Sequence, residues 1–265
     1  MSYQPANLDD QPNHSDEVYY YISESHDPFY NISLEDYLYQ ARRDCDRIYF
    51  FWINTPSVFM GRYQCAQAET DWVYLQAQHI PILRRSSGGG TVYHDTGNLN
   101  YTCILNSPER NGFDLKAFPR PIINALAHEG VELTLSPRGD LRFEGLKVGG
   151  SAEATRQGRM LYHMSLLFNA DLDQLERVLS VPKQEVARSR VSSVRSRVCN
   201  LSSVLPRQRT ILEFRDLILE EIHRQYPELR PLELDEEEAN AYIHRVREQR
   251  FANESWIHSS IGRKA

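Results

Sequence analysis

The sequence is poor in cysteine, and it has no long apolar run and no excess of basic residues. The cysteines form no C-x-x-C pair, which disfavours a zinc knuckle or a thioredoxin-like motif and favours reduced thiols. No apolar stretch reaches the roughly 18 residues of a membrane span. A net charge of −6 and a pI near 5.9 argue against general nucleic-acid binding. We therefore expect a globular protein with neither a nucleic-acid nor a membrane partner. The four cysteines are Cys45, Cys65, Cys103 and Cys199.

The common phosphate-binding signatures are missing as well. The chain contains neither the G-x-x-x-x-G-K-[ST] of a P-loop nor a G-x-G-x-x-G that opens a helix. These absences disfavour the P-loop and dinucleotide-binding folds.

The first residues are polar and acidic, without the apolar core of a signal peptide or the arginine-rich pattern of a transit peptide. We interpret 1–17 as a disordered tail and 18–265 as a single folded domain, because no repeat or long linker interrupts the chain. The expected compartment is the cytoplasm, with the mitochondrial matrix as the alternative.

Hydrophobic patterning predicts mostly strands early in the chain. The segments 48–54 and 57–61 are aromatic and β-branched, and 132–170 resembles consecutive antiparallel strands with turns at 137–139 and near Gly158. Further strands are predicted at 80–85, 91–95 and 99–106.

Helices are predicted from capping signals and apolar periodicity. One begins at Ser33, with Asp36 three residues later, and another spans 70–79 behind Thr70 or Asp71. The later helices are predicted at 172–180, at 211–226 behind a Thr210–Glu213 capping box, and at 236–257. Strands early and helices late predict an α+β layer fold.

The segment RRSSGGGTVYHDTGN, from Arg84 to Asn98, has the composition of a binding loop. Three consecutive glycines expose backbone N–H groups, which in a turn form a concavity for anions. Either of the two arginines adds a guanidinium suited to phosphate or carboxylate. A tight turn between strands explains the glycines when they are taken alone, whereas the flanking polar residues favour a site. His94 and Asp95 are neighbours on a strand and point to opposite faces, so we expect no His–Asp dyad.

Three later segments also carry candidate residues. Lys147, beside a double glycine, is either an exposed lysine on an edge strand or an ammonium that stabilises charge on a carboxylate and a phosphate. His163 and Ser165 share a strand face and line a pocket, unless His163 is a core histidine. The arginines of 188–198 either form a solvated face, dock an acidic partner or cover phosphates. These arginines are Arg188, Arg190, Arg195 and Arg197.

Together these segments resemble the lipoate–protein ligase family. Its R-R-x-S-G-G-G-x-V-x-H-D-x-G-N motif stands here in full, and its K-[VI]-x-G-[ST]-A motif stands as KVGGSA. The segments YHMSLL and SSVRSRVCNL match two further family motifs in the same order, and the resemblance covers about 28–258. It implies a biotin/lipoate ligase-like catalytic domain, which is a mixed β-sheet flanked by helices.

The resemblance also implies a two-step reaction and its site. Lipoate and ATP, with Mg²⁺, give lipoyl-AMP, and a lysine of an apo lipoyl domain then takes the lipoyl group. The acceptors would be 2-oxoacid dehydrogenase E2 subunits or the glycine-cleavage H protein. Lys147 would act as the catalytic cation. The residues implied to bind lipoyl-AMP are Arg85, Ser87, Gly88, Gly89, Gly90, Thr91, Val92, His94, Asn98, Asp140, Lys147, Gly150, Ser151, Ala152, His163 and Ser165.

The chain departs from the family pattern in three places. Gly139 stands where the family has Asn, Tyr162-His163 replaces a His-His pair, and Met164 replaces a smaller residue. The chain also ends where many members continue into a small C-terminal domain, so we expect no such domain here. A ligase, alone or with a separate small subunit, is then one interpretation. There are three alternatives. The first is a lipoyltransferase that uses preformed lipoyl-AMP, and the second is an octanoyl- or amidotransferase with a thioester at Cys103 or Cys65. The third is a non-catalytic lipoyl-domain-binding protein.

Overall fold

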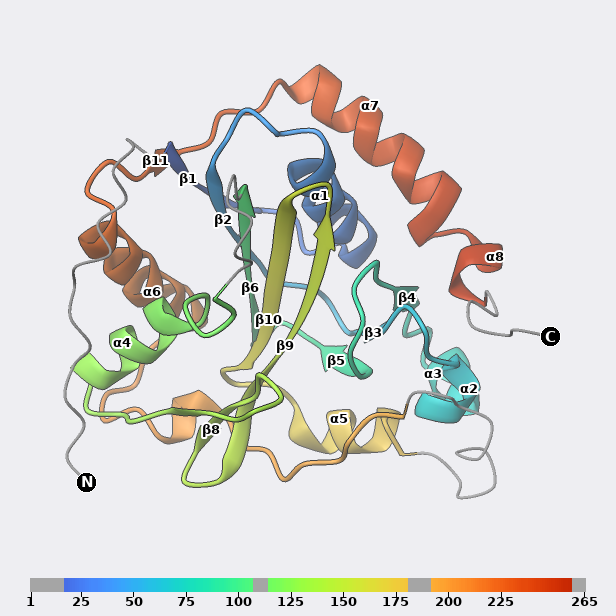
Figure 1. Ribbon diagram of the computed structural model, residues 1–265. Coiled ribbons are helices and arrows are strands. Elements are labelled where there is room, and N and C mark those ends of the chain that lie inside the picture. The colour runs from blue at the N-terminus through green and yellow to red at the C-terminus, as the bar shows by residue number, and fades with distance from the viewer. Residues whose placement is uncertain (1–16, 107–113, 181–191, 259–265) are drawn as a thin grey trace.

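The aromatic run of strand β2 (Arg47–Trp52) explains why the fold has layers. Tyr49 and Phe51 pack in one hydrophobic cluster, whereas Ile48, Phe50 and Trp52 pack in another on the opposite face. A strand buried on both faces needs no polar alternation, so its sequence is continuously apolar. In the computed structural model, which describes residues 17–106, 114–180 and 192–258, helices accordingly cover both faces of the central sheet (Figure 1).

The described strands form two sheets. The large one has the order β11-β1-β2-β6-β10-β9-β8-β7, parallel from β11 to β2 and antiparallel beyond. In the small one, β4-β3-β5, β4 is parallel and β5 antiparallel to β3. The bounds are β1 Val18–Ile22, β2 Arg47–Trp52, β3 Ser57–Met60, β4 Ile82–Arg84, β5 Val92–His94, β6 Asn98–Asn106, β7 Thr134–Leu135, β8 Leu141–Phe143, β9 Leu146–Arg156, β10 Arg159–Leu167 and β11 Arg230–Pro231.

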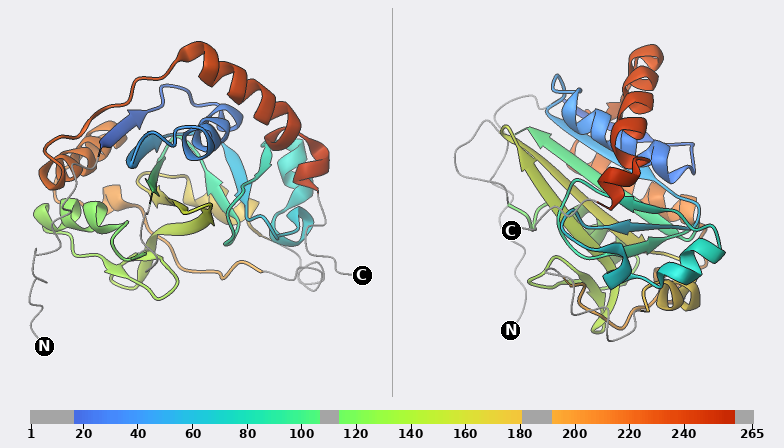
Figure 2. Two further views of the ribbon diagram at one scale, coloured as in Figure 1. Left: turned by 45° about the horizontal axis from the view of Figure 1, so that its top comes forward. Right: turned by 90° about the vertical axis from the view of Figure 1, so that its right-hand side faces the viewer.

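Helices α4 and α6 cover one face of the large sheet, and α1 and α7 cover the other (Figure 2). No helix in the described part of the chain is long and apolar enough to cross a membrane. The helices are α1 Pro28–Gln40, α2 Ala66–Glu69, α3 Trp72–Ala77, α4 Arg120–His128, α5 Leu172–Val178, α6 Ile211–Gln225, α7 Glu236–Val246 and α8 Glu254–Ile257, with a 3₁₀ turn at Leu201–Ser203 and a π-helical turn at Arg247–Phe251.

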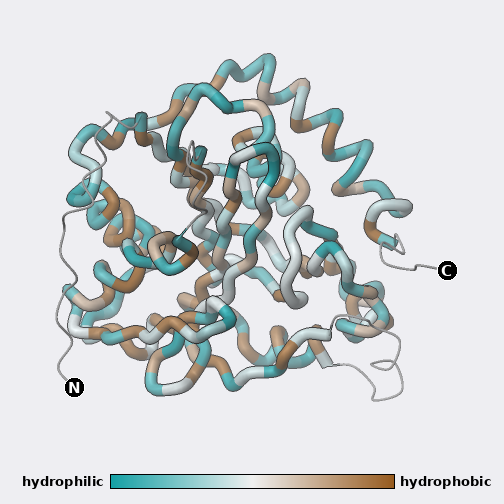
Figure 3. The backbone as a smooth tube through the Cα atoms, in the orientation of Figure 1, coloured by the Kyte–Doolittle hydropathy of each residue, from teal (hydrophilic) through white to brown (hydrophobic). Residues whose placement is uncertain are grey.

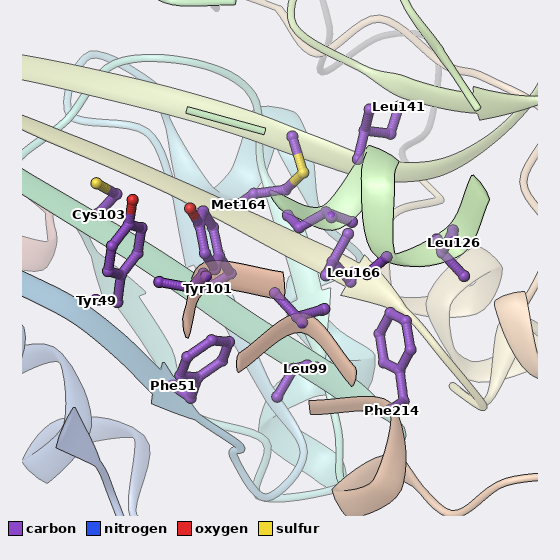
Figure 4. Packing of buried hydrophobic residues seen from close by; sticks show 14 of the residues in the cluster. Tyr49, Phe51, Leu99, Tyr101, Cys103, Leu126, Leu141, Met164, Leu166 and Phe214 are labelled. Carbon is purple, nitrogen blue, oxygen red and sulfur yellow. The ribbon is translucent and has the colours of Figure 1, made fainter. Parts of the chain in front are cut away.

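The two faces of the sheet hold different cores. Figure 4 shows one of them, in which Leu99 and Tyr101 of β6 lie with Leu166 of β10 and Phe214 of α6. Along α6 and α7, hydrophobic and hydrophilic residues alternate with the helical period, so each helix turns one apolar stripe to the sheet (Figure 3). This sandwich makes the large sheet a rigid platform for the residues on β9 and β10.

The prediction that the first helix begins at Ser33 is wrong. Helix α1 begins at Pro28, and the Asp27 carboxylate caps it by accepting from the Phe29 N–H at 2.9 Å. Asp followed by Pro is the stronger start signal, because the carboxylate satisfies an amide and the proline needs none. Ser33 lies inside the helix and donates its hydroxyl to the Phe29 carbonyl.

The prediction of one helix over 236–257 is also wrong. Helix α7 ends at Val246 and passes into the π-helical turn, and α8 starts anew behind Asn253, whose side chain accepts from the Ser255 N–H. The break lets Phe251 enter the core, while Arg250 of the same turn reaches Asp36 on α1. A periodic pattern alone does not reveal such an interruption.

Several other predictions are confirmed. The segment 132–170 forms antiparallel strands whose turns use Gly139 and Gly158 at positive φ. Asp71 caps α3, and Thr210 and Glu213 form a full capping box on α6. Strand β1, in contrast, was not predicted from the sequence. Residues 1–16 of the tail predicted over 1–17, together with the candidates Arg188 and Arg190, lie outside the described residues.

Arg84 of the small sheet binds the C-terminal helix α8 through hydrogen bonds. Its guanidinium is fully buried and donates to five carbonyls, those of Gly61, Arg62 and Gln64 after β3 and those of Trp256 and Ile257 in α8. The Trp256 indole donates back to the Arg84 carbonyl at 2.8 Å. Arg84 is therefore a structural residue, and its side chain is not available to a ligand.

We expect Arg84→Met to lower the free energy of unfolding by about 3 kcal/mol or more, because five carbonyls lose a charged, buried donor. Urea denaturation followed by circular dichroism measures this loss. The control is Arg207→Met, which makes the same change at an exposed position and should shift the free energy by less than about 0.5 kcal/mol. Equal stability of the two variants would contradict the assigned role.

Candidate functional site

The glycine segment forms a loop between β4 and β5, and Arg85 holds it from inside. The buried guanidinium of Arg85 donates to Ser87 Oγ at 3.0 Å and to the carbonyls of Phe59, Gly88 and Gly90 at 2.6–2.9 Å. Burial lowers the pKa of Arg85 to about 10, so it stays cationic at neutral pH. The loop therefore keeps its shape without a ligand.

Only some of the loop glycines are required by geometry. Gly89 has φ +82°, and a Cβ there would lie 2.9 Å from the Arg85 guanidinium. A Cβ on Gly61, beneath the loop, would lie 2.1 Å from the Gly89 carbonyl oxygen, so the two backbones touch there. Gly88, in contrast, has open space around its would-be Cβ. Gly61 had no prediction, because a single glycine after a strand carries no distinctive signal.

A cavity of about 290 Å³, the first cavity, opens between this loop and strands β9 and β10. Its wall contains most of the residues predicted as binding residues, and the remaining three, Ser87, Gly88 and Asn98, do not line it. Asn98 there donates to Ser165 Oγ at 3.2 Å. The predicted residues in the wall are Arg85, Gly89, Gly90, Thr91, Val92, His94, Asp140, Lys147, Gly150, Ser151, Ala152, His163 and Ser165.

The apolar side of the first cavity could not be assigned from the sequence. Ile32 of α1, Trp52 of β2 and Phe59 of β3 supply it, and Met164 lines it as well. In the sequence Ile32, Trp52 and Phe59 were indistinguishable from ordinary core residues, whereas Met164 stood out as a departure from the family motif. They make one side of the cavity suitable for an alkyl chain.

A buried polar chain links α1, β10 and the loop. His163 places Nδ1 3.0 Å from the Glu35 carboxylate and Nε2 2.8 Å from Ser87 Oγ. Thr102 donates to the same carboxylate at 2.7 Å. The orientation of the His163 ring is thus fixed from both sides, which argues against a merely passive core histidine. Glu35 was missed, because nothing in its helical context signals burial.

His94 and Asp95 behave independently, as predicted. The His94 Nδ1 atom lies 3.2 Å from the side-chain amide of Asn54, and burial lowers the His94 pKa to about 3. The Asp95 carboxylate instead accepts from the N–H groups of Gly97 and Asp171. They form no dyad, and His94 is a neutral ring in the cavity wall.

Lys147 of β9 projects into the site, paired with Asp140. Its Nζ lies 2.7 Å from Asp140 Oδ1, and Arg142 contacts the other oxygen at 3.0 Å. Lys147 also lines a second cavity of about 690 Å³, with Tyr93 and Leu175 among its apolar wall and Arg195 and Arg197 among its basic groups. Lys147 is therefore a partly exposed ammonium where the two cavities meet, not a lysine on a solvated edge.

Residues 192–198 run over both cavities and are tied to the loop. Ser193 Oγ accepts from the Thr91 N–H at 2.8 Å, and the Ser193 N–H donates to the Glu69 carboxylate. The backbone of Lys147 exchanges hydrogen bonds with Arg197 and Cys199. This explains why an arginine-rich segment of an acidic protein is held against the site.

The three departures from the family pattern have local explanations or consequences. Gly139 has φ +80°, and a Cβ there would lie 2.3 Å from Ser151 Oγ, which donates to the Gly139 carbonyl. Tyr162 turns away from the cavity and stacks on Phe118 in the core. Met164 lies in the cavity wall and takes up space there.

Comparison with known proteins identifies the family of the chain. Residues 27–223 match the family model of the lipoyl protein ligase A/B catalytic domain. The chain belongs to this family. It is 34% identical over 235 residues to lipoate-protein ligase LplJ of Bacillus subtilis, covering 87% of this chain and 70% of LplJ. It is 35% identical to lipoate–protein ligase 1 of Staphylococcus aureus, covering 74% of this chain and 60% of that protein.

Solved structures confirm the predicted fold. The bi-partite lipoate protein ligase of Thermoplasma acidophilum superposes with a TM-score of 0.74 at 24% identity, covering 94% of this chain and 98% of that one. Lipoate-protein ligase A bound with ATP superposes with a TM-score of 0.73 at 23% identity, covering 92% and 98%. The mixed sheet flanked by helices is thus the lipoate ligase catalytic fold.

We expect Gly89→Ala to reduce kcat/KM for lipoyl transfer about 10- to 100-fold, because a Cβ at positive φ strains the loop and displaces Arg85. Steady-state kinetics measures this change. The matched control is Gly88→Ala in the same loop, where a Cβ meets nothing and activity should stay within about twofold. Similar losses of kcat/KM in both variants would contradict the specific requirement for glycine at position 89.

Proposed function

We propose that this chain activates lipoate with ATP to form lipoyl-AMP and then transfers the lipoyl group to a lysine of an apo lipoyl domain. The observation that carries the proposal is the position of Lys147. Of the cationic side chains lining the two cavities in the described part of the chain, it is the one that lines both. An ammonium there faces the acyl oxygen and the α-phosphate in both half-reactions.

The two cavities suit the two halves of an acyl-adenylate. The first takes the acyl chain, because Ile32, Trp52 and Phe59 give it an apolar side. The second takes the nucleotide, because it is larger and combines apolar surface with Arg195 and Arg197 for phosphate. The mixed anhydride then lies at the junction, beside Gly150 and Lys147, which line both cavities.

The chemistry follows from this placement. A carboxylate oxygen of lipoate attacks the α-phosphorus of ATP, and pyrophosphate leaves. The acceptor lysine amine then attacks the acyl carbon, loses a proton and releases AMP. Lys147 balances negative charge in both steps, and the fixed N–H groups of the loop hold the oxygens without reorganisation.

Mg²⁺ enters this proposal together with ATP. In the described ranges no three His, Cys, Asp or Glu side chains come together to hold a metal ion, which fits an ion bound mainly through phosphates. Asp140 is the carboxylate in the first cavity beside Lys147, and it would supply the protein ligand. The bound ion would neutralise phosphate charge.

The alternatives of a different chemistry are not favoured. Cys103 lies in the core, where burial raises the pKa of its thiol to about 12, so no thiolate is available for a thioester. Cys65 lines neither cavity. A purely binding role is not favoured, because the relatives that the chain resembles are lipoate-protein ligases.

The acceptor is proposed by analogy. The Thermoplasma enzyme is bi-partite and was studied with its E2 lipoyl domain. We extend this to an apo lipoyl domain of an E2 subunit or of an H protein as the acceptor, with a separate small subunit as an accessory to adenylation.

Two parallel assays test the proposal. The chain is incubated with an apo lipoyl domain and either lipoate, ATP and Mg²⁺ or preformed lipoyl-AMP, and mass spectrometry follows lipoyl addition to one lysine. We expect addition in both. If the lipoyl group is added only in the assay with lipoyl-AMP, the chain needs a partner subunit for the adenylation step. If it is added in neither assay, the proposal is overturned.

We expect Lys147→Ala to lower kcat about 10²- to 10³-fold in either assay, because the developing charge loses its cation. The control is Lys116→Ala, an exposed lysine far from both cavities, which should leave kcat unchanged. Full turnover by the Lys147 variant, with the circular dichroism spectrum intact, would remove the role assigned to this residue.

A further inference from the structure

Two cations stand directly opposite each other in the hairpin that carries Lys147. In the ladder of β8 and β9, Arg142 pairs with Lys147, so both side chains lie on the same face of the sheet. Like charges in this position destabilise a sheet. The register of the ladder also shifts between Leu141 and Arg142, an irregularity of the kind that re-aims side chains beside active sites. Such a pair is tolerated only if the two cations share an anion.

The shared anion is the carboxylate of Asp140. Lys147 Nζ lies 2.7 Å from Asp140 Oδ1, and Arg142 donates through Nη2 to Oδ2 at 3.0 Å. Only 13% of the Asp140 side chain is exposed, so the carboxylate needs a cationic partner. Two cations and one carboxylate leave the cluster with one net positive charge, so Asp140 keeps a charged partner even when one of the two cations moves away.

Arg142 is the cation that is held in place. Its Nη1 donates to the carbonyl of Gly145 in the hairpin turn at 2.9 Å. Its Nη2 also lies 3.3 Å from the hydroxyl oxygen of Ser196, in the segment that runs over both cavities. These contacts orient the guanidinium fork independently of Lys147.

Lys147 is the cation that is placed to move. A Cβ on Gly150 would lie 2.7 Å from Nζ, so the absence of a side chain at position 150 gives the ammonium its space. Lys147 lines both cavities, whereas Arg142 lines neither. Of the two cations, Lys147 is therefore the one that reaches a bound acyl-adenylate.

We propose that Arg142 is a positioning residue that keeps Asp140 neutralised while Lys147 Nζ moves from this carboxylate to the oxygens of the acyl-adenylate. The inference rests on the proposed function and deepens it. With Arg142 in place, the exchange leaves no unpaired charge behind, which would be costly at a poorly exposed carboxylate. Without Arg142, the carboxylate retains Lys147, and the substrate loses the ammonium.

The test measures kcat and KM for transfer from preformed lipoyl-AMP, an assay that needs neither ATP nor Mg²⁺. We expect Arg142→Met to lower kcat about 10-fold, the size of one hydrogen bond to a charged group, with KM for the apo lipoyl domain unchanged. Arg142→Lys keeps a cation beside Asp140 and should retain most of the wild-type kcat. The control is Arg156→Met at the exposed end of β9, which should leave kcat unchanged. Wild-type kcat in folded Arg142→Met would overturn the inference.

A double variant separates this role from a merely structural one. Asp140→Asn combined with Arg142→Met removes the anion that would retain Lys147. We expect the double variant to transfer the lipoyl group faster than Arg142→Met alone, because the ammonium is released. Transfer by the double variant that is no faster than that of Arg142→Met would overturn the inference, since a second deletion does not repair a damaged structure.

A second substitution keeps the inference testable if Arg142→Met does not fold. Arg142→Gln keeps a donor for Asp140 and removes the charge, so it replaces Arg142→Met in both comparisons, with folding checked by circular dichroism. Normal transfer by the wild-type chain and by the Arg142→Gln variant would overturn this inference alone. No transfer from lipoyl-AMP by the wild-type chain would instead overturn the proposed function together with it.

Discussion

Two adjacent buried arginines, satisfied largely by backbone carbonyls, are the constraint on which the site depends. Arg84 joins β4 to the turn after β3 and to α8, and Arg85 closes the glycine loop on itself. A buried cation is costly unless all its donors are paired. The carbonyls of the glycine loop therefore stay where the Arg85 guanidinium needs them. This order exists before any ligand binds, which is the condition for electrostatic stabilisation without reorganisation.

The rest of the site is assembled against that loop from distant parts of the chain. Strand β10 brings His163 to Ser87, helix α1 brings Glu35 to His163, and β9 brings Lys147 to Asp140. Each of these elements also belongs to one of the two cores that enclose the large sheet. Changes in core packing are therefore transmitted to the positions of the polar groups, because the same strands carry both.

Much of the fold was predictable because its signals are local. The capping box of α6, the Asp71 cap of α3 and the turn glycines at 139 and 158 each act within a few residues. The start of α1 was missed for a comparable reason, since the nearby Ser33 pattern competed with the stronger Asp27–Pro28 signal. The π-helical turn that divides the last helix could not be predicted from the sequence. It depends on tertiary contacts, since Phe251 packs against α1 and Arg250 bonds to Asp36.

The sequence by itself determined the family, the glycine loop and the candidate Lys147, because contiguous motifs keep their meaning without a fold. Tertiary structure decided which of two neighbouring arginines is purely structural, and it showed that Ser87 and Asn98 do not line the cavity but contact His163 and Ser165 in its wall. It also identified Glu35, Trp52 and Phe59 as site residues. Burial and pairing depend on which segments meet, and a buried carboxylate looks in sequence like any exposed one on a helix.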